Sequence, residues 1–196
     1  MIKEYMNSLR DERLKSIFDK ANTVKGLLLY SIVLCGVIFS IQLTVSLLSN
    51  GVGFPLDDSW IHLTYARSLA EGRGWSYGLN PPSAGSTSVL WTLLLVPGFW
   101  FGESGFYIWT MGLSFVVYSV LTFYTLLLFK TRSGARIEPT LFLGAIVALE
   151  WHLLWASGSG METLLAALGY VAAFLLLTAE RPKFILVGMA VGALSA

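Results

Sequence analysis

The sequence predicts an all-α fold: a polytopic bundle of transmembrane helices with interfacial helices in its first external loop. Hydrophobic residues make up 55% of the chain and charged residues only 13%, whereas a soluble domain usually has about 25% charged residues. The hydrophobic residues gather in uncharged runs that reach or approach the roughly 20 residues a helix needs to cross a bilayer. The formal charge of +1 gives no indication of a nucleic-acid-binding surface.

The first uncharged run, residues 26–48, predicts a membrane helix that is retained as a signal anchor. This run is too long for the hydrophobic core of an ordinary cleavable signal peptide, and charged and polar residues precede it over 1–25. Basic residues in that segment place it in the cytoplasm by the positive-inside rule. They are Lys3, Arg10, Arg13, Lys15, Lys20 and Lys25. Residues 26–196 are then the transmembrane domain.

Three further runs predict membrane helices over 107–129, 140–156 and 164–178. A fifth run begins at residue 184 and reaches residue 196, so we expect it to be incomplete. A helix of that length rises about 20 Å, which is less than the hydrocarbon thickness of about 30 Å. We therefore expect the chain to be a truncated reading frame or the N-terminal part of a larger enzyme.

The run 89–102 is apolar but short, and Pro97-Gly98 interrupts it, so it could cross the membrane or lie in its interface. If it does not cross, every cluster of basic residues after 129 falls on the cytoplasmic side, as the positive-inside rule favours. These residues are Lys130, Arg132, Arg136, Arg181 and Lys183. Residues 49–106 then form one external loop with interfacial helices over 58–71 and 89–102, and the link 157–163 lies on the same face.

Two adjacent acids, Asp57 and Asp58, follow the first membrane run closely. Carboxylates held near hydrocarbon are costly, which makes them candidates for function. One carboxylate can act as a general base while its neighbour caps a helix or helps bind a cation. Alternatively, either Asp simply caps the helix that follows. On that helix Asp58, His62 and Tyr65 share one face, and Ile61, Tyr65 and Leu69 form an apolar stripe suited to the interface.

Other polar residues have both a structural and a functional interpretation. Glu162 opens the last complete helix, where it could favour the helix N-terminus or face the same cavity as Asp57. Arg67 could bind a phosphate, or it could simply be solvated at the surface or form a salt bridge with Glu71. Within the run 140–156, His152 is interpreted as a polar helix contact or an interfacial side chain, and Glu150 stays open.

The run 57–74 resembles the first external loop of polytopic glycosyltransferases with the GT-C fold. It has an acid pair and an aromatic residue, and then the pattern Tyr-Ala-Arg-x-Leu-Ala-x-Gly-x-Gly over 65–74. It is most similar to the arabinofuranosyl- and mannosyltransferase-like branch that uses polyprenyl-phosphate sugars. The segments 86–91 and 159–163 also resemble parts of that family, so the resemblance covers roughly residues 26–178.

The resemblance implies an inverting transfer of a sugar from a polyprenyl-phosphate donor to a hydroxyl of a glycan, lipid or protein outside the cytoplasm. It implies that the protein is a multi-pass protein of the cell membrane. Asp57 matches the general base and Asp58 its neighbour. Glu162 matches a second acid that holds the donor phosphate or a divalent cation such as Mg²⁺ or Mn²⁺, and Arg67 matches the arginine of the helix. His62 receives no role. The alternative is a non-catalytic membrane protein that binds polyprenyl lipid or partners a larger transferase.

Overall fold

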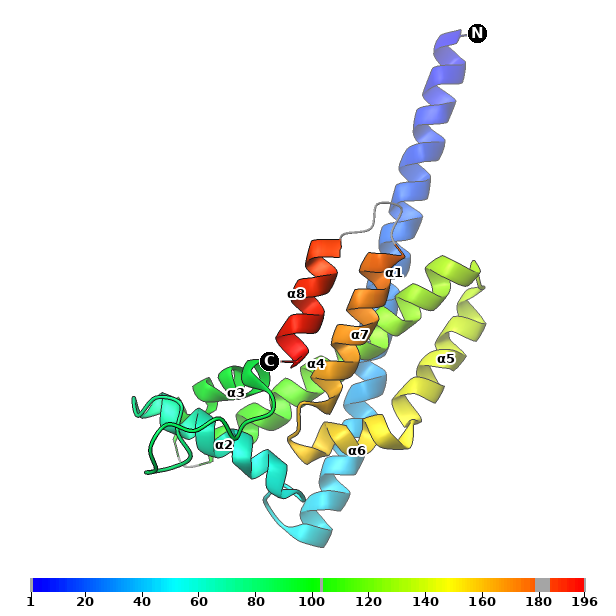
Figure 1. The fold of residues 1–196 in the computed structure, drawn as a ribbon. Coiled ribbons are helices and arrows are strands. Elements are labelled where there is room, and N and C mark those ends of the chain that lie inside the picture. The colour runs from blue at the N-terminus through cyan, green and yellow to red at the C-terminus, as the bar shows by residue number, and fades with distance from the viewer. Residues whose placement is uncertain (1, 103, 179–183, 196) are drawn as a thin grey trace.

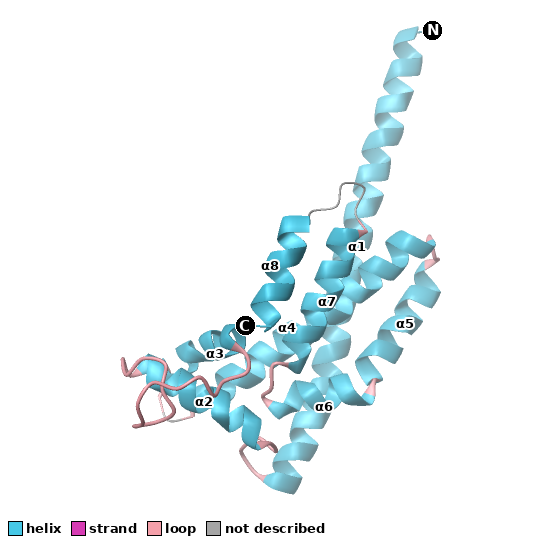
Figure 2. Cartoon of the chain, viewed as in Figure 1, coloured by secondary structure: helices cyan, strands magenta, loops and turns pink. Residues whose placement is uncertain are grey.

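The computed structural model describes the chain except residues 1, 103, 179–183 and 196, and within the described ranges it is helical with no strand (Figures 1 and 2). The predicted all-α class is therefore confirmed. The elements are α1 (Ile2–Asn50), α2 (Asp57–Ala70), α3 (Val89–Leu95), the 3-10 helix η1 (Val96–Trp100), α4 (Gly105–Ser133), α5 (Ile137–Leu149), α6 (Trp151–Ser159), α7 (Thr163–Leu177) and α8 (Phe184–Ser195).

Within the part of the chain that the structure describes, two helices are long and apolar enough to cross a membrane by themselves, Ala21–Ser49 within α1 and α4 (Gly105–Ser133). They pack against each other, with Cys35 of α1 in one buried cluster with Tyr118 and Leu121 of α4. The outward side of α1 carries exposed Leu, Val and Ile side chains, as expected of a helix in lipid. Both helices therefore have the length and composition of membrane-spanning helices. α1 also continues toward the N-terminus through the basic segment, as far as Ile2.

The run 140–156, expected as a single helix, is two helices. α5 ends at Leu149 and α6 begins at Trp151, with a bend of 54° between them. Glu150 has extended backbone angles at the break, and its side chain accepts a hydrogen bond of 2.9 Å from the backbone N–H of Leu153. A carboxylate that caps a new helix inside an apolar run stabilises a break there. The pair forms at most one broken span.

The run 89–102 is also divided, into α3 and η1. Pro97 stands in the first turn of η1, and the two short helices together rise about 20 Å, too little to cross the hydrocarbon. Gly98 is buried where η1 meets α4, and a Cβ there would lie 3.0 Å from Cα of Phe106. Glycine thus allows the two helices to approach closely.

The last two helices, α7 and α8, are each shorter than a full span. α7 packs against α4, and Leu164 of α7 belongs to the buried cluster around Cys35. The final predicted residue, 196, and the basic residues Arg181 and Lys183 lie outside the described residues. Five separate spans are therefore not shown: among the described residues α1 and α4 are candidate spans by length and composition, and the α5–α6 pair is a third candidate if it crosses as one unit.

The short elements gather at one end of the bundle. α2, α3, α6 and the first turn of α7 lie toward the end of the bundle where α1 terminates, whereas the N-terminus of α1 and the α4–α5 turn lie toward the opposite end (Figure 1). Lys130, Arg132 and Arg136 belong to that α4–α5 turn or flank it. The acid pair and the basic cluster are thus at opposite ends of the molecule.

Candidate functional site

The acid pair forms the first turn of α2. The cap position belongs to Leu56, which has extended backbone angles, so the expectation that Asp57 or Asp58 caps this helix is wrong. Both carboxylates are exposed, and their position in the first turn is favourable because they face the positive end of the helix dipole. With Pro55 and Leu56 they line a pocket of about 360 Å³.

The opposite side of α2 is buried. Tyr65 was expected on a stripe facing the membrane interface, but it is inside, because its hydroxyl lies 2.6 Å from Oγ of Ser83 and accepts a hydrogen bond of 2.8 Å from the N–H of Gly85. Its ring also contacts Trp75, with centroids 5.5 Å apart. Tyr65 therefore holds the polar loop between α2 and α3 against the helix.

The loop between α6 and α7 is docked on α2 and α3 by its backbone carbonyls. Ser59 of α2 donates a hydrogen bond of 2.6 Å to the carbonyl of Ser159, and Nε1 of Trp91 in α3 donates one of 3.0 Å to the carbonyl of Gly160. All these groups are buried. Gly160 has a φ of +77°, and a Cβ there would overlap the ring of Phe54. The loop is therefore held in one conformation.

His62 lies at the centre of this junction and is 1% exposed. Its Nε2 is 3.0 Å from Oε2 of Glu162, the residue just before α7. Its Nδ1 is 3.0 Å from the hydroxyl of Ser86 and 3.3 Å from that of Thr92, and these two hydroxyls are 2.7 Å apart. One imidazole thus joins α2, the loop before α3, α3 itself and the start of α7.

Glu162 is only partly accessible: its side chain is 23% exposed, but Oε2 is buried. The closest partner of Oε2 is Nε2 of His62, and no described group makes a well-aligned hydrogen bond to this oxygen. The contact with His62 lowers the pKa of Glu162 below its ordinary value, although partial burial works in the opposite direction. Glu162 is therefore ionised at neutral pH.

The other predicted residues lie away from this cluster. Arg67 is exposed on α2, and its Nε is 2.8 Å from Oε1 of Glu71, which also pairs with Arg73. The salt-bridge interpretation of Arg67 therefore describes the structure, and a role in binding phosphate stays a prediction. His152 is 85% exposed, and its Nδ1 lies 2.7 Å from the capping carboxylate of Glu150.

A preformed metal site is not found among the described residues. No three His, Cys, Asp or Glu side chains in that part of the chain stand close enough together to hold an ion. The neighbour of Glu162 is instead a histidine whose second ring nitrogen is engaged by hydroxyls. The residues present therefore do not fit a divalent cation held by the protein alone.

Sequence reasoning identified Glu162 and the 86–91 segment but not the residue that joins them. His62 and Glu162 are 100 positions apart, and Thr92 lies just beyond the segment that carried the resemblance. The one local signal was the spacing that put His62 a helical turn after Asp58. No protein-family model matches this chain, and neither a curated protein nor a solved structure matches it.

Proposed function

We propose that this protein is an inverting glycosyltransferase that moves a sugar from a polyprenyl-phosphate donor to an extracytoplasmic hydroxyl. One observation carries the proposal: the segment 159–163 is far in the sequence from the segments 57–74 and 86–91, which also resemble the GT-C family, but all three meet at one end of the bundle. Contacts of Ser59 with Ser159, of Trp91 with Gly160, and of His62 with Glu162 join them. A shared site would require these segments to be adjacent.

The proposed reaction is a single displacement. The carboxylate of Asp57 takes the proton of the acceptor hydroxyl as that oxygen attacks the anomeric carbon of the sugar. The bond between that carbon and the phosphate oxygen breaks, and polyprenyl phosphate leaves with the electron pair. Asp57 suits the role of base because it is exposed in an open pocket, and Asp58 follows it on the same helical turn.

The proposed orientation puts the site outside the cytoplasm. The acid pair and the basic α4–α5 turn lie at opposite ends of the bundle (Figure 1), and basic loops favour the cytoplasmic side. A donor with a polyprenyl tail must reach the site from the bilayer. A pocket next to the end of a membrane-length helix, α1, is open to such a donor.

The test is transfer of a radiolabelled sugar from polyprenyl phosphate in membranes that contain the protein as its own gene encodes it. We expect Asp57→Asn to abolish transfer while expression and membrane insertion persist. The matched control is Glu138→Gln, because Glu138 is also a first-turn helix acid but lies at the opposite end, in α5. Retained transfer in Asp57→Asn would reject Asp57 as the base, and absence of transfer by the wild-type protein would reject the function.

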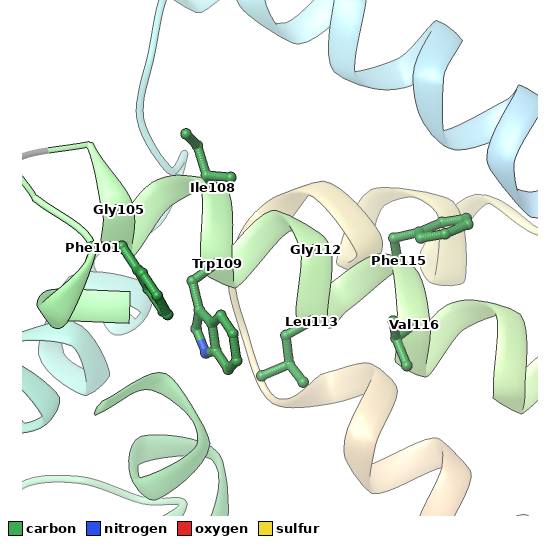
Figure 3. Close-up of a pocket in the computed structure, with 8 residues that line it drawn as sticks. All are labelled: Phe101, Gly105, Ile108, Trp109, Gly112, Leu113, Phe115 and Val116. Atoms are coloured by element: carbon green, nitrogen blue, oxygen red, sulfur yellow. The ribbon is translucent and has the colours of Figure 1, made fainter. Parts of the chain in front are cut away.

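A second candidate is a non-catalytic protein that binds polyprenyl lipid. It is favoured by an apolar groove of about 620 Å³ along α4, in which Phe101 and Trp109 are stacked with ring centroids 5.7 Å apart (Figure 3). The lining residues are Phe101, Gly105, Ile108, Trp109, Gly112, Leu113, Phe115 and Val116. A photoactivatable polyprenyl-phosphate probe that crosslinks to α4 without any sugar transfer would support this candidate instead.

A further inference from the structure

The chain has two histidines, and each lies beside a glutamate, but their environments are opposite. His152 is 85% exposed and touches Glu150 on the surface, whereas His62 is 1% exposed and has partners on both ring nitrogens. A buried imidazole with every polar atom engaged is held in one orientation, since any rotation would leave a ring nitrogen unpaired. An exposed imidazole has no such constraint.

We infer that His62 is a positioning residue that fixes the carboxylate of Glu162 close to the acid pair of α2. Asp58 and His62 are one helical turn apart on the same face of α2, a spacing that puts their Cβ atoms about 5–6 Å apart. The 3.0 Å contact at Nε2 then brings Glu162, from the other side of the junction, to that same turn. The effect of His62 on sugar transfer rests on the proposed function, whereas its effect on the pKa of Glu162 does not.

The partners determine which nitrogen carries the proton. A carboxylate only accepts hydrogen bonds, so Nε2 of His62 carries the hydrogen that faces Glu162. Nδ1 then accepts from the hydroxyl of Ser86 or Thr92, and the second hydroxyl donates to the first across 2.7 Å. The carboxylate thus selects the tautomer, and the two hydroxyls, which can donate or accept, complete the hydrogen bonding at Nδ1 and hold the ring in place.

The same arrangement leaves part of the Glu162 side chain accessible to a ligand, beside its contact with Thr87. Oε2 is buried against His62, while the side chain as a whole keeps 23% of its surface exposed. An ionised carboxylate that cannot turn away is a pure acceptor, and the hydroxyl groups of a sugar are donors that match it. Phosphate oxygens would be repelled. Glu162 is therefore better suited to the sugar than to the donor phosphate.

Few charged groups face His62. Asp58 precedes it by one turn on α2, and Glu162 approaches it from the start of α7. α3 and the segment before it contribute the neutral hydroxyls of Ser86 and Thr92. The charge state of this cluster therefore depends on two carboxylates and one imidazole, and a change at His62 should be felt first by Glu162.

The first experiment measures the protonation of Glu162 without any substrate. Infrared difference titration of the purified protein in lipid nanodiscs, with Glu162→Gln to assign the carboxyl band, gives its pKa directly. In the wild type we expect a value below the ordinary 4.5. In His62→Phe, which keeps a ring of similar size without nitrogen, we expect a higher pKa than in the wild type, because the strongest lowering contact is lost while burial and the weaker contact with Thr87 remain. His62→Gln, which keeps an N–H donor, should preserve much of the lowering.

The matched control is His152→Gln, which should leave the Glu162 band unchanged. An unchanged pKa in His62→Phe would overturn the inference. If His62→Phe does not insert into membranes, the Ser86→Ala and Thr92→Val double variant takes its place. It removes the hydroxyls that fix the imidazole, so the pKa of Glu162 should rise, and a value equal to the wild type would again overturn the inference.

The second experiment is kinetic and uses the transfer assay. A misplaced contact to the sugar should lower transfer by about 10-fold to 100-fold in His62→Phe. It should also move the acid limb of the pH profile upward together with the pKa of Glu162, which a loss of stability alone would not do. An acid limb that stays in place would reject the kinetic role. Absence of transfer in the wild type would reject the proposed function and leave the titration to decide the inference.

Discussion

Gly160→Ala is the substitution whose effect the structure defines best. Gly160 has a φ of +77°, which costs an alanine about 1–2 kcal/mol. A Cβ there would lie 2.7 Å from Cε1 of Phe54 and closer still to Cδ1, both ring atoms of a buried side chain. Crowding of this kind in a packed core costs about 1–3 kcal/mol. The lower freedom of alanine in the unfolded chain returns about 0.4–1 kcal/mol.

The net loss in the free energy of unfolding is therefore about 3 kcal/mol. Gly134 separates the two terms, because it also has a positive φ, +61°, but a Cβ there would meet nothing within 4 Å. Gly134→Ala should cost only about 1 kcal/mol. At about 2–4 °C per kcal/mol for a chain of this size, the melting temperature should fall by about 6–12 °C in the first variant and 2–4 °C in the second.

The assay uses the one cysteine of the chain. Cys35 of α1 is buried against α4, so a thiol-reactive fluorescent dye reports the temperature at which the contact between these two helices opens. Equal shifts in Gly160→Ala and Gly134→Ala would refute the reasoning. They would mean that Phe54 moves aside at little cost, and that the loop before α7 is not held in the way its carbonyl contacts indicate.

Three further predictions concern the same junction and its neighbour. The pKa of Glu162 is lower in the folded state than its ordinary value, so its charge stabilises the fold above about pH 4.5, and this stabilisation is lost as the pH falls through the folded pKa. The melting temperature should therefore drop more steeply on acidification in the wild type than in Glu162→Gln. Trp91→Phe keeps an aromatic ring but removes the hydrogen bond to Gly160 and leaves a small cavity at a buried position, so it should cost at least about 1–2 kcal/mol. Glu150→Ala removes the side-chain cap of α6 and should lower the melting temperature.

Each of the three has a control in the chain. Glu138→Gln, an exposed acid at the other end of the bundle, should reproduce the wild-type pH dependence. Trp100→Phe changes an exposed tryptophan and should shift the melting temperature little. His152→Ala removes an exposed partner of Glu150 but not the cap, so it should cost less than Glu150→Ala. The assigned contacts would be contradicted if the melting temperatures of the wild type and Glu162→Gln fell in parallel with pH. They would also be contradicted if Trp91→Phe and Trp100→Phe, or Glu150→Ala and His152→Ala, shifted the melting temperature equally.

The long helices could be predicted from the sequence because their signal is local. An uncharged run of more than 20 residues has few alternatives to a membrane-length helix, and both α1 and α4 contain such a run. The break at Glu150 could not be predicted in this way. A single carboxylate lowers the average hydropathy of its run only slightly, yet it can bind the backbone of the next turn and end one helix by starting another.

The site is less predictable because its contacts are long-range. The spacing of Asp58 and His62 was visible, since helical periodicity is a property of neighbouring residues. The partner of His62 was not, because the pairing with Glu162 depends on how α6 turns back toward α2. Tyr65 shows the same limit: its spacing suited a face toward the interface, but a hydroxyl contact with Ser83 places it inside.

The position of Glu162 relative to Asp57 and Asp58 depends on contacts made by residues that are not acidic. Ser59 lies between Asp58 and His62, and its 2.6 Å hydrogen bond to the carbonyl of Ser159 fixes the loop that ends in Glu162. Ser59→Ala would remove this bond from a buried carbonyl without touching any carboxylate. If the acids work together, transfer should fall in Ser59→Ala while the titration of Glu162 stays close to that of the wild type, because His62 remains. If Ser59→Ala loses both sugar transfer and the lowered pKa of Glu162, the bond to Ser159 also holds His62 against Glu162.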